Sequence, residues 1–115
     1  NKTDLPYLHL TAPAICSHDR QPLAKRDFLQ RIALTLKPLL ELGATIAVAA
    51  DHTTDSNTGS HSADPVPALI YQPGDSRQAE PVKFGETSCS EGNMGRQLSK
   101  EFLSQVVTTM KSAAV

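Results

Sequence analysis

The alternation of apolar and polar positions predicts two strands joined by a helix in the first half of the chain. Residues 5–10 are short, largely apolar and followed by a Thr-Ala-Pro breaker, which favours a strand. Between residues 22 and 42, apolar residues recur every three or four positions, the spacing of an amphipathic helix that ends at Gly43. Pro38 lies inside this pattern and should kink the helix or split off its last turn. Residues 44–50 follow as a second strand, so the order is that of a βαβ unit with two parallel strands.

The second half of the chain alternates polar loops with short apolar segments. Residues 51–66 form a polar stretch too long for a simple turn, and loops of that length tend to be functional. We expect a strand at 68–71 and a second amphipathic helix at 98–110. Other segments are expected to be turn-rich at 72–81, extended at 82–87 and a glycine-containing loop at 90–96. The whole pattern predicts an α/β fold, a mainly parallel sheet with flanking helices, in a single unit over residues 1–115.

Composition and charge narrow the class of protein. The 115 residues carry 11 Lys and Arg against 12 Asp and Glu, a formal net charge of -1, which argues against both disorder and nucleic-acid binding. The longest apolar run, residues 46–50, is far shorter than the roughly 20 residues that span a bilayer, so no membrane partner is expected. Two isolated cysteines suit a reducing cytoplasm. The chain begins with Asn just before a predicted core strand, so we expect a piece of a longer protein.

Four polar side chains are expected at one edge of the predicted sheet. Asp51 and His52 directly follow the second strand, the first strand leads towards His18, and His61 lies in the long loop. In open parallel sheets ligands bind beyond the carboxyl ends of the strands. Imidazoles with a carboxylate are ligands of Zn²⁺, Mn²⁺ or Fe, which makes these four residues a candidate metal site. The alternatives are a solvated His61, an Asp51 that caps its turn and a His18 beside a helix cap, while His9 is expected inside its strand.

Three further features are weaker candidates. Cys16, two residues before His18, could bind a soft metal, although a small buried thiol is the more frequent state. The run Ser17-His18-Asp19 contains the residue types of a hydrolytic triad, but a triad is defined by spatial geometry and not by adjacency. Residues 92–96 could bind an anion through backbone N–H groups, yet two glycines more often form only a turn.

Several stretches resemble one known family in order along the chain. They are LHLTAP at 8–13, AADHTT at 49–54, HSADPVPALIY at 61–71, FGE at 84–86 and GNMGR at 92–96. Together they resemble the C-terminal part of the archaeal-type cofactor-independent phosphoglycerate mutases, which belong to the alkaline-phosphatase-like superfamily. The resemblance implies a partial alkaline-phosphatase-like domain: a parallel α/β core with two divalent metals, Mn²⁺ or Zn²⁺, at the strand ends.

The resemblance also assigns roles to single residues. Asp51 and His52 match the pair that binds one metal, and His18 and His61 match two ligands of the other. Ala14 stands where the family has a ligating Asp, and Ile15 stands where it has the neighbouring acid. The nucleophilic Ser of the family has no match here and is expected outside this chain.

The resemblance implies a function for the full-length protein. By the resemblance, the chain would be the metal-binding C-terminal portion of a 2,3-bisphosphoglycerate-independent phosphoglycerate mutase-like phosphotransferase. The full-length enzyme would interconvert 3-phosphoglycerate and 2-phosphoglycerate. Its partners would be that small-molecule substrate and the remainder of the parent chain, and this chain alone is expected to be inactive. The alternatives are a degenerate, non-catalytic relative, which Ala14 favours, and a phosphatase- or sulfatase-like hydrolase of the same superfamily.

Overall fold

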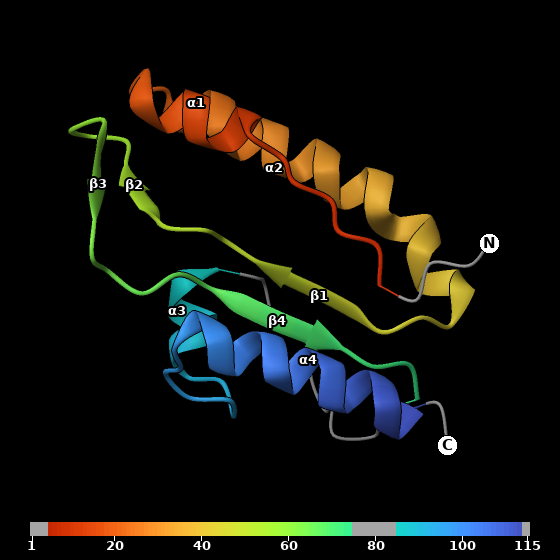
Figure 1. Ribbon diagram of the computed structural model, residues 1–115. Helices are drawn as coiled ribbons and strands as arrows, with labels where there is room; N and C mark the ends of the chain where they lie inside the picture. The colour runs from red at the N-terminus through yellow and green to blue at the C-terminus, as the bar shows by residue number, and fades with distance from the viewer. Residues whose placement is uncertain (1–4, 75–84, 114–115) are drawn as a thin grey trace. The chain divides into compact units, whose positions relative to one another are not determined.

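The computed structural model describes residues 5–74 and 85–113, which combine helices with short paired strands (Figure 1). In chain order the elements are α1 (Ala12–His18), α2 (Pro22–Leu36), the 3-10 helix η1 (Lys37–Leu42), β1 (Ile46–Ala49), β2 (Thr53–Asp55), β3 (Ser60–Ser62), β4 (Ala68–Tyr71), α3 (Glu86–Ser90) and α4 (Ser99–Ala113). The mixed α/β class expected from the sequence is therefore confirmed.

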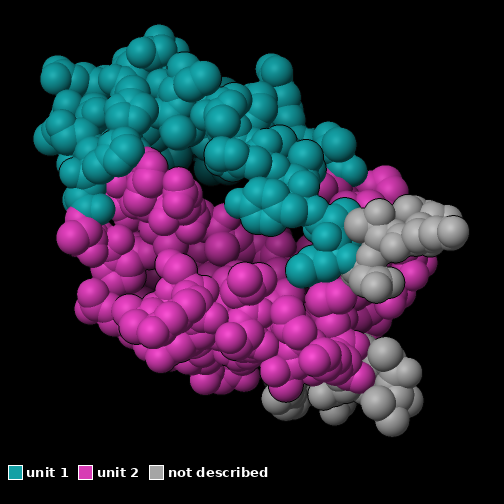
Figure 2. All heavy atoms as spheres, in the orientation of Figure 1, with its two compact units in different colours: residues 1–35, 54–62 teal, residues 36–53, 63–115 magenta. Residues whose placement is uncertain are grey.

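The chain divides into two compact units, coloured separately in Figure 2. Unit 1 consists of Asn1–Thr35 and Thr54–Ser62, and unit 2 of Leu36–Thr53 and Ala63–Val115. Unit 1 contains α1, β3 and all but one residue each of α2 and β2, whereas unit 2 contains η1, the β1–β4 ladder, α3 and α4. The single unit expected from the sequence stays a prediction.

The long amphipathic pattern forms a helix that changes type near its end, as predicted. The α-helix starts at Pro22 and ends at Leu36, and Pro38 then lies in the first turn of the 3-10 helix η1. Proline has no N–H to donate and crowds the carbonyl four residues before it, which explains the change after Leu36. Gly43 ends η1 with a φ of 67°, a left-handed conformation that glycine adopts without steric cost.

The predicted parallel pairing of residues 5–10 with 44–50 is wrong. Residues 5–10 form no strand, and the observed strand β1 pairs with β4 in antiparallel orientation, from Ile46 opposite Tyr71 to Ala49 opposite Ala68. Pro13 does not act as a secondary-structure breaker. It lies in the first turn of α1, which begins at Ala12, and proline is favourable in the first turn of a helix. Between β1 and β4 the chain makes the β2–β3 hairpin, and it returns along β1 in the opposite direction.

The other predicted elements differ in how well they match. The strand at 68–71 and the helix at 98–110 are confirmed as β4 and α4. The loop predicted at 51–66 contains the two short strands β2 and β3, since each pairs with the other across a tight turn. Of the segment predicted as extended at 82–87, the last two residues lie in α3, and 82–84 lie outside the described residues, as do 75–81.

Few apolar side chains are buried in either unit. In the described residues Val106 of α4 is the one buried apolar side chain, at 4% exposure, and every residue of β4 is half-buried. Large apolar side chains that remain exposed are Leu5, Tyr7, Leu8, Leu10, Ile15, Leu23, Leu29, Leu34, Leu39, Leu40, Leu42, Leu98 and Leu103. No helix among the described residues is long and apolar enough to cross a membrane.

Candidate metal-binding site

His18 is the last residue of α1, and one hydrogen bond sets the protonation of its ring. Its Nδ1 lies 2.8 Å from the carbonyl oxygen of Gly59. A carbonyl oxygen can only accept a hydrogen bond, so Nδ1 carries the proton and donates it. In a neutral ring the free lone pair is then on Nε2. A histidine that binds a metal through Nε2 has this tautomer.

His61 presents its own ring nitrogen to that lone pair. It lies in β3, and its Nε2 is 3.1 Å from the Nε2 of His18. The two ring centroids are 4.9 Å apart, and the ring planes are inclined by 35°. At this distance one ring nitrogen donates a hydrogen bond to the other. Because Nε2 of a neutral His18 carries no proton, it accepts the hydrogen bond that His61 Nε2 donates. The structure thus brings together two of the predicted ligands from positions 43 residues apart in the sequence.

The β2–β3 turn places the carbonyl that orients His18. The Gly59 N–H donates to the Asp55 carbonyl at 2.7 Å, and the Asn57 N–H donates to the Asp55 side chain at 2.8 Å. Gly59 has a φ of 73°, which favours glycine at this point of the turn. Sequence reasoning missed Gly59 as a functional residue; the one signal was the turn-forming composition of Ser-Asn-Thr-Gly inside the polar segment.

The distance between the two imidazoles fits two ligands of one metal ion. Nitrogens bound to a tetrahedral Zn²⁺ at about 2.0–2.1 Å lie about 3.3 Å apart, close to the observed 3.1 Å. Both side chains are exposed, so an ion can reach them. Zinc sites have four ligands, of which three or four come from the protein, so a site built on this pair would need further donors.

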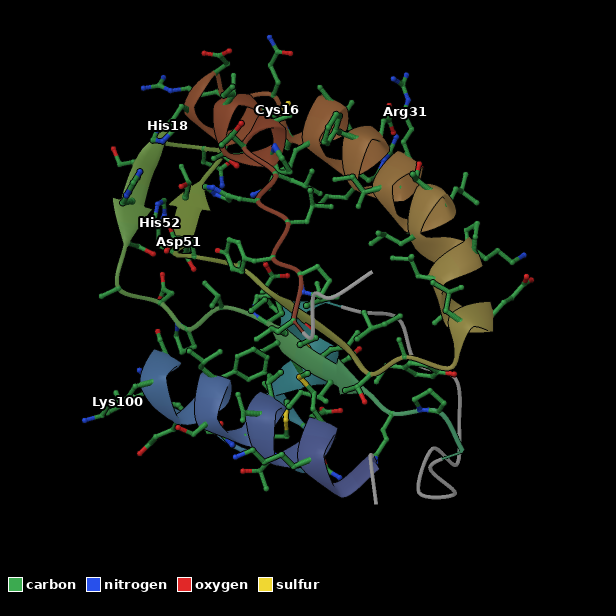
Figure 3. The ribbon with its side chains drawn as sticks, turned by 45° about the vertical axis from the view of Figure 1, so that its right-hand side comes forward. Cys16, His18, Arg31, Asp51, His52 and Lys100 are labelled. Carbon is green, nitrogen blue, oxygen red and sulfur yellow. The ribbon has the colours of Figure 1, made fainter. Side chains whose placement is uncertain are left out.

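Asp51 and His52 form the second pair of predicted ligands, in unit 2. They follow β1 and lie beside each other in Figure 3, with the Asp51 Oδ2 3.6 Å from the His52 Nε2. The Asp51 side chain is 81% exposed and that of His52 37% exposed. Just after them, the Thr53 hydroxyl donates to the Asp64 carbonyl at 3.1 Å, which ties the start of β2 to the segment that follows β3.

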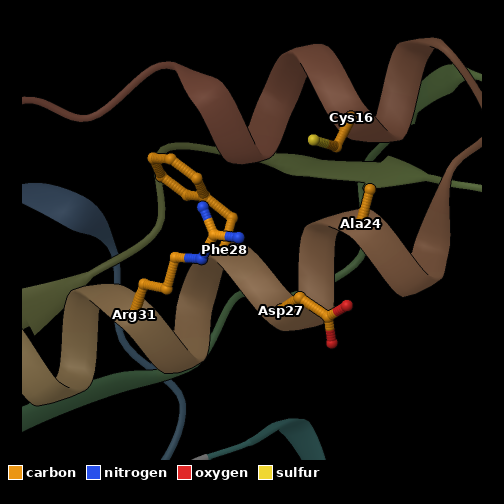
Figure 4. Close-up of a pocket in the computed structure, with 5 residues that line it drawn as sticks. All are labelled: Cys16, Ala24, Asp27, Phe28 and Arg31. Atoms are coloured by element: carbon orange, nitrogen blue, oxygen red, sulfur yellow. The ribbon is translucent and has the colours of Figure 1, made fainter.

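A complete metal site is not formed by the described residues alone. Within residues 5–74 and 85–113, no three His, Cys, Asp or Glu side chains gather as a possible metal site. Cys16 does not join His18, because it lines a shallow pocket of about 310 Å³ against α2, together with Ala24, Asp27, Phe28 and Arg31 (Figure 4). The Cys16 thiol is half-buried, which agrees better with a packed thiol than with a metal ligand beside His18.

Comparison with known proteins identifies the family. The sequence model of the metalloenzyme superfamily matches residues 1–105. The chain belongs to the metalloenzyme superfamily. It is 40% identical over 96 residues to the 2,3-bisphosphoglycerate-independent phosphoglycerate mutase of Methanoculleus marisnigri and 38% identical over 95 residues to that of Methanosphaerula palustris. Identity to the enzyme of the same name from Pyrobaculum aerophilum is 34% over 98 residues. No solved structure gives a significant match.

This metalloenzyme chain corresponds to only part of its relatives. The matched regions cover 83%, 81% and 84% of the chain but only 23%, 23% and 24% of the three mutases. The chain therefore spans about a quarter of the length of the relatives that it matches.

Proposed function

We propose that this chain is the metal-binding C-terminal portion of a 2,3-bisphosphoglycerate-independent phosphoglycerate mutase-like phosphotransferase. The observation that carries the proposal is the His18–His61 pair, with Nε2 atoms 3.1 Å apart, in a chain similar to mutases of that name. In the full-length protein the reaction would interconvert 3-phosphoglycerate and 2-phosphoglycerate in the cytoplasm. The β1–β4 ladder would be one edge of a larger, mainly parallel, alkaline-phosphatase-like sheet.

In this proposal each pair of residues binds one metal ion. His18 and His61 would hold one ion through their Nε2 atoms, which requires the His61 ring to carry its proton on Nδ1 instead of Nε2 once the ion replaces their hydrogen bond. Asp51 and His52 would hold the other ion through a carboxylate and an imidazole. Mn²⁺ or Zn²⁺ suits this mixture of oxygen and nitrogen donors. When bound, such ions neutralise charge on a phosphoryl group and activate the hydroxyl that accepts it. The accepting Ser and the remaining ligands are supplied by the rest of the longer protein.

A non-catalytic relative is the second candidate, and one residue favours it. Ala14 is the third residue of α1 and lies one helical turn before His18, so both occupy the same helix face. A methyl group there gives no metal ligand, in contrast to the carboxylate that the resemblance places at this position. A phosphatase- or sulfatase-like hydrolase would require the same metal pairs, and the substrate that the full-length protein turns over would distinguish it.

Metal titration of single-histidine variants tests the metal-binding part of the proposal. Calorimetric titration with Zn²⁺ should show binding to the unmodified chain and at least a 10-fold loss in affinity for His18→Ala and for His61→Ala. His9→Ala is the matched control, since His9 is also exposed and is no expected ligand. Equal Zn²⁺ binding by all four proteins would contradict the assignment of the pair.

A chimeric enzyme tests the catalytic part. The segment of the Methanoculleus marisnigri mutase that aligns with this chain is replaced by the chain itself, and 2-phosphoglycerate formation is followed in a coupled assay. With Ala14→Asp added, we expect measurable mutase turnover that His61→Ala abolishes. Hydrolysis of phosphate esters without mutase turnover would favour the hydrolase, and absence of both activities would favour the non-catalytic relative.

A further inference from the structure

Gly59, in the β2–β3 turn, lies close to both the side chain and the backbone of His18. Its carbonyl oxygen accepts the hydrogen bond from His18 Nδ1 at 2.8 Å. On its other side, a Cβ atom added at Gly59 would lie 2.8 Å from the backbone carbonyl oxygen of His18. Real Cβ atoms do not approach an oxygen so closely, so any side chain at this position must displace the turn or the helix end.

Displacing the C-terminal end of α1 would break hydrogen bonds. After His18, the Asp19 N–H donates to the Ile15 carbonyl at 3.0 Å, and the Gln21 N–H donates to the Cys16 carbonyl at 2.8 Å. These bonds hold the last turn of α1 and with it the carbonyl of His18. The turn would therefore have to withdraw, and the carbonyl of Gly59 would withdraw with it from Nδ1.

We propose that Gly59 is a positioning residue that fixes His18 in the tautomer with an unprotonated Nε2. The inference rests on the proposed metal-binding function, and it adds a residue to which neither the sequence motifs nor the resemblance assigns a role. Gly59 acts through His18: its carbonyl holds the proton on Nδ1, and the lone pair of Nε2 is thereby directed to the side where His61 lies. Carbonyl partners of metal-binding histidines orient the ring and raise its basicity.

A spectroscopic measurement on the metal-free chain tests this role without any activity assay. The protein is labelled with ¹⁵N-histidine, and long-range ¹H–¹⁵N spectra at neutral pH report which ring nitrogen of His18 carries the proton. The His18 signals are assigned by comparison with His18→Gln. We expect a protonated Nδ1 and an unprotonated Nε2 in the unmodified chain. A neutral His18 ring that carries its proton on Nε2 instead of Nδ1 would overturn the proposal.

A matched pair of glycine variants separates close approach from backbone strain. Gly59→Ala places a methyl group against the His18 carbonyl, whereas Gly43→Ala has a similar φ of 67° and nothing within 4 Å of the added atom among the described residues. We expect Gly59→Ala to lose the single tautomer and to bind Zn²⁺ about 10- to 100-fold more weakly. Gly43→Ala should keep both the tautomer and the affinity.

The two readouts keep the inference distinguishable from the proposed function. If the unmodified chain shows the expected tautomer but takes up no Zn²⁺, the metal assignment fails while the role of Gly59 in orienting His18 stands. If Gly59→Ala keeps the tautomer and the Zn²⁺ affinity of the unmodified chain, the role of Gly59 is refuted and the metal assignment is unaffected. Should Gly59→Ala fail to fold by circular dichroism, the tautomer of the unmodified chain decides alone.

Discussion

Replacing Ala14 with Asp should give the His18–His61 pair a third donor. Ala14 and His18 are four residues apart on α1, and the Cβ atoms of such neighbours lie roughly 5–6 Å apart. Helix side chains lean towards the N-terminus, so the His18 side chain leans towards residue 14. Residue 14 is in the first turn of α1, where a carboxylate is also favoured by the helix dipole, and the substitution should not unfold the helix.

The gain in affinity follows from the charge of the new carboxylate. A divalent ion and a carboxylate charge about 3 Å apart attract each other by about 3 kcal/mol even at the dielectric constant of water. Ordering the Asp side chain costs about 1 kcal/mol. The net of about 2 kcal/mol corresponds to about a 30-fold increase in affinity. The increase should be larger for Mn²⁺ than for Zn²⁺, because harder ions depend more on oxygen ligands.

Isothermal titration with Mn²⁺ and with Zn²⁺ measures the effect directly. Ala14→Asn is the matched control, since it has the same shape as the Asp variant without the charge, and its gain should be much smaller. In the double variant Ala14→Asp/His18→Ala the gain should disappear if both side chains bind the same ion. An equal gain in the Asn variant, or a gain that persists without His18, would refute the geometric reasoning.

Two other substitutions test unit 2. Val106→Ala should lower the free energy of unfolding by about 2 kcal/mol, because it truncates the one buried apolar side chain among the described residues. Denaturant titration measures this free energy. Leu103→Ala is the control on the same helix and should have a much smaller effect, since Leu103 is 58% exposed. His52→Ala should remove one Zn²⁺ from the binding stoichiometry and leave the ion held by His18 and His61, and unchanged stoichiometry would show that Asp51 and His52 hold no ion of their own.

Local sequence signals predicted the two long helices, α2 and α4, and the later strand β4, but they did not predict the short helices α1 and α3. The spacing of apolar residues and Pro38 gave both α2 and its change to η1, and the short β-branched and apolar run at residues 68–71 gave β4. These elements are determined by nearby residues: helix periodicity, a missing proline N–H and a left-handed glycine at residue 43. Such signals lie within a few positions of the feature that they determine.

The pairing of strands could not be read from local sequence in the same way. Residues 5–10 have the composition of a buried strand, yet they are exposed and form no strand, whereas residues 46–49 pair with residues that lie 19 to 25 positions later. A βαβ pattern specifies parallel strands only if the first segment joins the sheet. In a chain that spans about a quarter of its relatives, the strand neighbours that would pair with residues 5–10 can belong to the rest of the longer protein.

Of the four residues predicted as one site, His18 and His61 lie close together in unit 1, and Asp51 and His52 lie close together in unit 2. The histidines were expected together because of their places after strands, but His18 ends a helix and His61 lies in β3. Their contact depends on the β2–β3 turn, which carries Gly59 to the end of α1. No pattern of residue types encodes a 2.8 Å approach between a glycine carbonyl and an imidazole, so this part of the site required the structure.

The most direct test of the central claim is X-ray absorption at the zinc edge of the chain loaded with one equivalent of Zn²⁺. The chain carries His52→Ala, so that the other pair does not compete for the ion. We predict two imidazole nitrogens at about 2.0–2.1 Å from zinc, and their replacement by oxygen ligands when His18→Ala and His61→Ala are added. A zinc spectrum that is the same with and without His18 and His61 would contradict the claim that these two side chains bind the metal.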